Sequence, residues 1–83
     1  MSKETLKAEI IAYYRGEEPF PCATLNSEDV ERIERITTIN MLDGAEQVTV
    51  KVRGTEYDPG AWIAYVTGVL DTVSPLPVRN GQS

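Results

Sequence analysis

The side chains that most often carry chemistry are scarce in this sequence, which contains no histidine and one cysteine, Cys22. Histidine is the usual acid–base group near neutral pH and the commonest metal ligand. Its absence excludes a Ser/His/Asp triad, a Cys/His pair and most zinc sites. Cys22 lies between two apolar neighbours with no basic residue beside it, so we expect it to be buried and unreactive. Since no glycine-rich phosphate loop or CxxC pair is present either, we predict a non-enzymatic protein without a cofactor or a bound metal.

Carboxylates are the remaining candidates for catalysis or for a divalent metal site. The acidic residues outside the predicted helices are Glu17, Glu18, Asp43, Glu46, Glu56 and Asp58. Their spacing does not match a calcium-binding loop. Asp58 is better explained as a helix cap, and Asp43 as a turn or helix-end residue. We therefore assign no catalytic role to any carboxylate pair.

A small anion-binding set is a second candidate. Lys51 and Arg53 share one face of a predicted strand, and Arg15 could lie nearby. Together with an exposed tyrosine, they could hold a phosphate or a nucleotide by charge and stacking. Alternating charge on the outer face of a strand also serves solubility alone, and we favour that interpretation.

Aromatic residues are concentrated in or beside two predicted helices. Tyrosine and tryptophan are typical of binding hot spots, although a shared aromatic core between the two helices is the interpretation that we favour. The last predicted helix also carries a stripe of small residues, Ala61, Ala64 and Gly68, which would allow a close approach of another chain. The predicted partner-binding residues are Tyr13, Tyr14, Trp62, Tyr65 and Gly68.

The first predicted element is a helix over residues 3–15. Leu6, Ile10 and Tyr13 recur at helical spacing, and Gly16 follows as a helix-ending residue. The prolines of the connection that follows forbid a helix there. Residues 22–25 could form a short edge strand.

The middle of the chain has two interpretations. In the favoured one, a helix capped by Asn26 or Ser27 continues to Met41 or Leu42 and ends at Gly44. In the other, Asp43 and Gly44 form a hairpin turn. The alternation over residues 48–52 predicts a strand in both cases. With the longer helix, that strand would pair with residues 22–25 or with a second chain.

The third predicted helix is the best delimited. Asp58 is a good N-cap, and Pro59 suits the first helical position. Tyr57 and Trp62 occupy the two positions of a hydrophobic staple. We expect this helix to extend to about Val73.

Length and composition define the class of protein. With 83 residues and 41% hydrophobic residues, the chain can form one small domain, which we place at residues 1–74 with a flexible tail at 75–83. The predicted fold is α+β, with three helices and a short β element that is either a hairpin or a two-stranded sheet. The net charge of −5 argues against nucleic-acid binding. We find no apolar run typical of a signal peptide or a membrane span, so we expect a cytoplasmic protein of a microbe or of a virus-infected cell.

These observations favour a small protein–protein interaction domain that acts as an adaptor, an inhibitor or an assembly factor. By analogy with other compact acidic proteins that occlude a partner's surface, an inhibitor of viral origin is included among these hypotheses. The alternatives are a module that sequesters an anionic small molecule and a structural subunit of a symmetric assembly. We also expect the chain to form a homodimer, through the last predicted helix or through the strand at 48–52.

Overall fold

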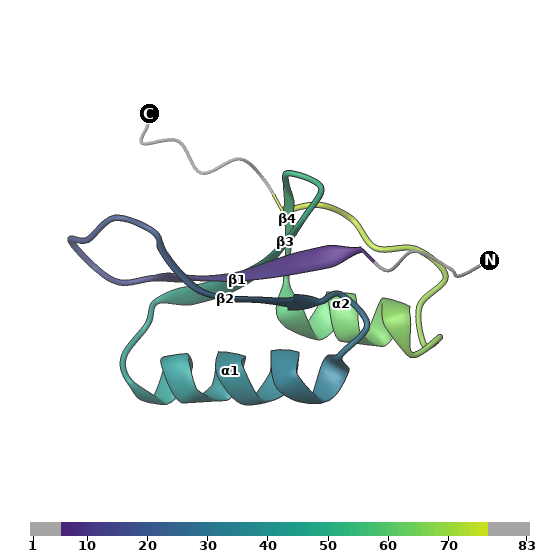
Figure 1. Cartoon of the computed structure of the whole chain (residues 1–83), viewed down its shortest axis with the longest axis horizontal. Coiled ribbons are helices and arrows are strands. Elements are labelled where there is room, and N and C mark those ends of the chain that lie inside the picture. Colours follow the sequence, from purple (N-terminus) through teal and green to yellow (C-terminus); the bar gives the residue numbers. More distant parts are fainter. Residues whose placement is uncertain (1–5, 77–83) are drawn as a thin grey trace.

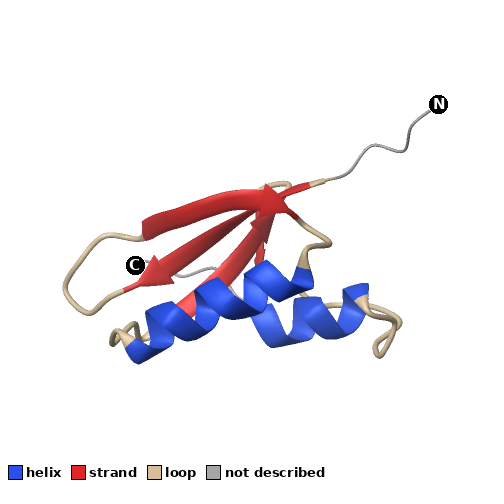
Figure 2. Ribbon diagram, turned by 60° about the horizontal axis from the view of Figure 1, so that its bottom comes forward, coloured by secondary structure: helices blue, strands red, loops and turns tan. Residues whose placement is uncertain are grey.

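The computed structural model describes residues 6–76, in which two helices cover one face of a four-stranded antiparallel sheet. The strand order is β2-β1-β3-β4. Figure 1 shows the elements in sequence colours, and Figure 2 shows both helices on the same side of the sheet. The elements are β1 (Lys7–Tyr13), β2 (Phe20–Asn26), α1 (Val30–Leu42), β3 (Gln47–Val52), β4 (Thr55–Tyr57) and α2 (Pro59–Val66).

The architecture is α+β, as the sequence indicates, but the prediction of three helices with a short β element is wrong. The described residues contain two helices, and the sheet has four strands. The difference arises at the first element. From Lys7 onward, the segment predicted as a helix over 3–15 is the central strand β1, while residues 3–5 lie outside the described residues.

The core lies between the sheet and the helices. Ala8, Ile10 and Ala12 alternate along β1 and are buried, as period-2 geometry requires of a strand with one face on the core. Val50 of β3 lies opposite Ile10 and is fully buried beside it. From the helices, Ile33 of α1 is fully buried and belongs to the same core cluster.

Helix α1 follows the longer of the two interpretations and ends at Leu42. Gly44, with φ of +108°, is the residue just past its end, and the Ala45 amide donates to the Asn40 carbonyl at 3.0 Å. These are the bonds of a glycine-ended helix, which confirms Gly44 as the stop signal. The Asp43-Gly44 hairpin is therefore not formed.

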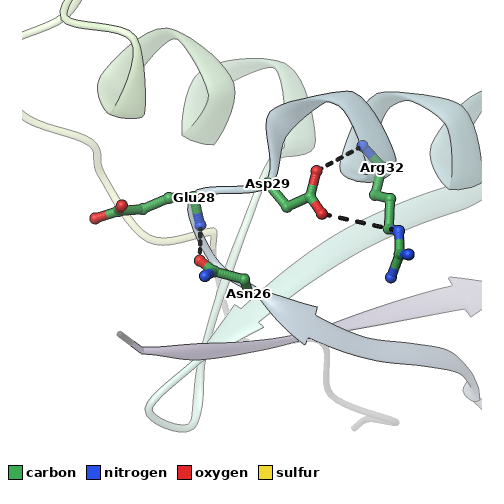
Figure 3. Close-up of polar contacts among 4 residues, drawn as sticks. All are labelled: Asn26, Glu28, Asp29 and Arg32. Carbon is green, nitrogen blue, oxygen red and sulfur yellow. Dashed lines mark hydrogen bonds and ion pairs between the residues drawn. The ribbon is translucent and has the colours of Figure 1, made fainter. Parts of the chain in front are cut away.

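The N-cap of α1 is Asp29 rather than Asn26 or Ser27. Its carboxylate accepts from the Arg32 amide at 3.3 Å and also lies 3.8 Å from the Arg32 side chain (Figure 3). Asn26 stabilises the turn that precedes the helix. Its side-chain oxygen accepts a hydrogen bond from the Glu28 amide at 2.7 Å.

The strand predicted at 48–52 is confirmed as β3, but its expected partners are wrong. It pairs with β1 on one side and β4 on the other, so it is an internal strand. Residues 22–25 do lie in an edge strand, β2, which pairs with β1 instead. The hairpin turn joining β3 to β4 is Arg53-Gly54, with φ of 56° and 80°. Two consecutive positive φ values of this size are those of a type I′ turn, which suits the twist of a hairpin.

Helix α2 begins as predicted and ends early. Asp58 is its N-cap, accepting from the Ala61 amide at 3.1 Å, and Pro59 occupies the first position. The predicted end near Val73 is wrong, because Gly68 adopts φ of +90° and stops the helix at Val66. Of the predicted tail at 75–83, residues 77–83 lie outside the described residues, and the Leu76 amide still donates to the Glu56 carbonyl of β4 at 2.9 Å. Within residues 6–76, neither helix is long and apolar enough to cross a membrane.

Candidate functional site

A cavity of about 560 Å³ opens at the end of the molecule where the β3–β4 hairpin meets α2. Four parts of the chain contribute to it: the residue before β1, the β3–β4 hairpin, α2 and the segment that follows α2. Its lining consists of Leu6, Val52, Arg53, Thr55, Tyr57, Trp62, Tyr65, Asp71, Thr72 and Val73. The cavity thus combines an aromatic and aliphatic interior with an exposed cation and an exposed carboxylate at its rim.

Three aromatic rings in contact form one wall of this cavity, which we call the aromatic wall (Tyr57, Trp62 and Tyr65). The ring centroids of Tyr57 and Trp62 lie 5.1 Å apart, and those of Trp62 and Tyr65 lie 5.5 Å apart. Both pairs are tilted, by 36° and 52° respectively, which falls in the favourable range for aromatic contacts. The first pair is the predicted hydrophobic staple, in which the residue before an N-cap packs on the fourth residue of the helix.

Trp62 is held in place by a hydrogen bond that it donates to a residue distant in the sequence. Its indole N–H donates to the Ser27 carbonyl at 2.7 Å, in a buried position. The donor is used within the fold, and Trp62 is only 6% exposed as part of the hydrophobic core, so it presents only a small part of its ring to the cavity. The Asp58 cap fixes the start of the same helix, so the wall is preformed rather than assembled on binding.

Polar groups without internal partners surround this wall. Among residues 6–76, the hydroxyls of Tyr57 and Tyr65 have no hydrogen-bond partner, and neither Arg53 nor Asp71 forms an ion pair. Arg53 holds its position at the rim through the hairpin turn, at a positive φ that non-glycine residues rarely adopt. Backbone strain of this kind is often found at functional sites.

The structure gathers only part of the predicted partner-binding set. Trp62 and Tyr65 line the cavity, whereas Tyr13 and Tyr14 lie at the far end of β1 from Leu6. Gly68 is outside α2 and serves as its stop residue, so the small-residue stripe is not continuous along the helix.

The two tyrosines at the far end have structural partners of their own. The Tyr13 hydroxyl donates to the Glu56 carboxylate on the open face of the sheet, and that carboxylate also accepts from the Thr49 hydroxyl at 2.7 Å. The Tyr14 hydroxyl lies 2.9 Å from the Asn40 side-chain oxygen and 3.0 Å from an Asp43 carboxylate oxygen. Burial is the largest cause of the raised pKa of Tyr14, and its hydrogen bond to Asp43 adds to it.

The predicted anion-binding set is not brought together. Arg15 follows the end of β1 and Arg53 follows the end of β3, and since these strands are antiparallel the two arginines lie at opposite ends of the sheet. Lys51 lies on the open face, directly across from Glu9 on one side and Glu56 on the other. Only Arg53 remains available beside the aromatic wall.

Cys22 is half-buried in β2, and burial raises the pKa of its thiol, which makes it a weak nucleophile. Its sulfur lies 3.6 Å from the Phe20 carbonyl oxygen. Within the described part of the chain, no three His, Cys, Asp or Glu residues are grouped so that they could hold a metal ion.

The predicted partner-binding set omits Tyr57 as well as Leu6, Asp71 and Val73, all of which line the cavity. The available signal for Tyr57 was Gly54, because a turn that ends in glycine between two segments of alternating hydrophobicity favours a β-hairpin. Such a hairpin places Tyr57 opposite Val50. Searches against protein-family models, curated proteins and solved structures found no match to this chain. The geometry of the cavity therefore carries the functional argument.

Proposed function

We propose that this protein is a small non-enzymatic protein–protein interaction domain whose binding surface is the aromatic cavity. The observation that carries this proposal is the wall of Tyr57, Trp62 and Tyr65 around an open space of about 560 Å³. Tyrosine and tryptophan dominate binding hot spots because they bury a large area at low entropic cost. A partner protein would insert an apolar side chain against this wall, and the domain would act as an adaptor, an assembly factor or an inhibitor that occludes the partner's surface.

The fixed geometry of the wall supports a binding role. The Trp62–Ser27 hydrogen bond and the Asp58 cap hold the rings before any partner arrives. A preformed surface loses less conformational entropy on binding than a flexible one, so more of the contact energy appears as affinity. The hydroxyls of Tyr57 and Tyr65, which have no hydrogen-bond partner among residues 6–76, add donors that could select a partner with matching acceptors.

The two edge strands of the sheet are poorly suited to pair with a strand of another protein, which favours the aromatic cavity as the binding surface. The edge strand β2 contains Pro21, and its pairing with β1 shifts register between Ile10 and Ile11. Proline and register irregularities are devices by which edge strands avoid pairing with another chain. The other edge strand, β4, is three residues long and already accepts a hydrogen bond from Leu76.

Intrinsic fluorescence offers a direct test, because Trp62 is the only tryptophan in the chain. Peptides selected from a random display library would be titrated into the protein while Trp62 emission is followed. We expect binding peptides to carry an apolar anchor residue and to change the emission. Tyr65→Ala should weaken binding by about 1–2 kcal/mol, which is roughly 5- to 30-fold in Kd.

The matched control is Leu42→Ala at the end of α1, which lies at the opposite end of the molecule from the end of α2 (Figure 1). Leu42 is 84% exposed, so its truncation should leave both the fold and the peptide affinity unchanged. The proposal fails if the selected peptides bind without altering Trp62 emission and lose affinity in Leu42→Ala rather than in Tyr65→Ala.

An anionic small molecule is the second candidate, favoured by Arg53 at the rim of the same cavity. A guanidinium beside aromatic rings can hold a phosphate or carboxylate while a planar group stacks on the wall. A thermal-shift screen with nucleotides tests this alternative. A rise in Tm that disappears in Arg53→Gln would support it, and no rise with any nucleotide would exclude this ligand class.

A further inference from the structure

Two large apolar side chains are exposed immediately after α2. Val69 is 77% exposed and Leu70 is 42% exposed, and we call this pair the Val69–Leu70 knob. Both amides donate to the Ala64 carbonyl, at 2.8 and 3.1 Å. The glycine-ended helix therefore holds the knob in a defined position. The residue at this place after a glycine-ended helix often packs on the third or fourth residue from the helix end, here Ala64 or Ile63, yet Val69 remains 77% exposed.

The knob lies directly beside the cavity. Tyr65 in the last turn of α2 belongs to the aromatic wall, and Asp71, which directly follows Leu70 in the chain, lies on the rim. One surface thus carries a hollow with an apolar interior and, next to it, an unpaired apolar projection. An isologous contact requires a projection and a hollow on one surface, so that a two-fold axis can place each projection in the other copy's hollow, and this surface carries both.

We infer that the partner of the aromatic cavity is a second copy of this chain, and that two copies exchange their Val69–Leu70 knobs across a two-fold axis. This inference rests on the proposed function for its binding surface and names the partner. It differs from pairing through the strand at 48–52, because β3 already has a neighbour on each side.

The rim charges support this occupant over an unrelated chain. Arg53 and Asp71 both lie at the cavity, and within the described residues neither forms an ion pair. When a knob enters the other copy's cavity, Asp71 beside the knob approaches Arg53 of the other copy. Two such pairs arise by symmetry, and they offset at short range the repulsion between two chains that each carry a net charge of −5.

Sedimentation velocity of the full chain from about 1 to about 300 μM tests the inference, since this range brackets micromolar to submillimolar self-association. We expect a monomer–dimer equilibrium. Val69→Ser should raise the dimer Kd at least about tenfold, a typical loss for an interface anchor. Leu70→Ser is the second variant, used if Val69→Ser alters the circular dichroism spectrum. The control, Leu42→Ser, removes an exposed leucine at the other end of the molecule and should leave the Kd unchanged.

A charge-exchange cycle tests the geometry. Arg53→Glu and Asp71→Arg should each weaken the dimer, and the double variant should restore it to within about threefold of the native Kd. If the single substitutions instead weakened the dimer by disturbing packing or folding, their effects on the Kd would add in the double variant.

The inference is overturned by a monomer throughout this range, which leaves the proposed function standing if peptides still perturb Trp62. It is equally overturned by a dimer that tolerates Val69→Ser and Leu70→Ser, or by a charge cycle without restoration. The proposed function fails separately, when Tyr65→Ala affects neither peptide binding nor self-association.

Discussion

The indole nitrogen of Trp62 lies 2.7 Å from the carbonyl oxygen of Ser27, and this buried hydrogen bond ties α2 to the turn before α1. It joins residues 35 positions apart in the sequence. The same contact fixes the central ring of the aromatic wall, so stability and the shape of the candidate site depend on one interaction.

Trp62→Phe removes the donor while keeping an aromatic ring. The Ser27 carbonyl is then left buried without its partner, and we expect the free energy of unfolding to fall by about 1–3 kcal/mol. Urea unfolding followed by circular dichroism measures this, since the variant has no tryptophan. Tyr65→Phe is the control, because its hydroxyl has no partner in the described residues and its loss should change stability by less than about 0.5 kcal/mol. Equal effects of the two variants would contradict the role of the hydrogen bond.

Asp58→Ala removes the cap of α2. The carboxylate accepts from the Ala61 amide at 3.1 Å, and its loss should lower the free energy of unfolding by about 1 kcal/mol. Asp58→Asn retains a side-chain oxygen acceptor and should be nearly neutral, which separates capping from charge. Chemical denaturation of the three proteins is sufficient. If the asparagine variant were as unstable as the alanine variant, capping would not be the cause.

The Arg53-Gly54 turn predicts opposite effects at its two positions. Asn-Gly is a preferred pair for a type I′ turn, so Arg53→Asn should raise the free energy of unfolding by up to about 1 kcal/mol. Gly54→Ala should lower it by about 1–2 kcal/mol, the cost of a left-handed conformation for a residue with a Cβ. Apart from its chain neighbours, an added Cβ at Gly54 meets no atom within 4 Å, so this cost arises in the local backbone rather than from a clash with other parts of the protein. Thermal and urea unfolding check both changes, and a destabilising Arg53→Asn would show that the arginine side chain stabilises the hairpin by contacts.

The half-buried thiol of Cys22 gives a pH-dependent prediction. Burial raises its pKa in the folded state, so the folded chain holds this proton more tightly than the unfolded chain. The resulting contribution to stability is complete below the unfolded pKa of about 8.5 and is lost as the pH rises through the higher folded pKa. As the pH rises from about 7 to about 10, the free energy of unfolding should therefore fall less in Cys22→Ala than in the native protein.

Alkylation of the same thiol supplies an independent measurement. Iodoacetamide should react more slowly with the native chain at about pH 8 than with the urea-unfolded chain, because less thiolate is present when the pKa is raised. The single cysteine makes the reaction unambiguous. Equal rates in the two states would show that Cys22 is neither buried nor perturbed.

The sequence by itself determined the features whose causes lie within a few residues. The start of α2 follows from Asp58, Pro59 and the Tyr57–Trp62 spacing, and each of these acts within one helical turn. Gly44 ended α1 by the same local logic. Gly68 carried an identical signal, and its role in ending α2 could have been inferred from the sequence, since only glycine adopts its φ of +90° without strain.

The tertiary structure alone decided the state of β1. Its seven residues, which include two alanines, one glutamate and two isoleucines, satisfy helical spacing as well as strand alternation, and local propensity favours a helix for several of them. A strand gains its hydrogen bonds only from its neighbours, and here these are β2, across a short loop, and β3, which follows only after α1. The burial of Ala8, Ile10 and Ala12 in the hydrophobic core outweighs the helical preference of these residues.

The candidate site shows the same division. Trp62, Tyr65 and Arg53 could each be singled out from the sequence by residue type. Their convergence with Leu6 and Asp71 could not, because it depends on how the start of β1, the hairpin and the segment after α2 meet at one end of the sheet. That meeting depends on the pairing of β1 with β3, which lie on either side of α1 in the sequence, and this pairing follows from the burial of one shared core rather than from a local turn.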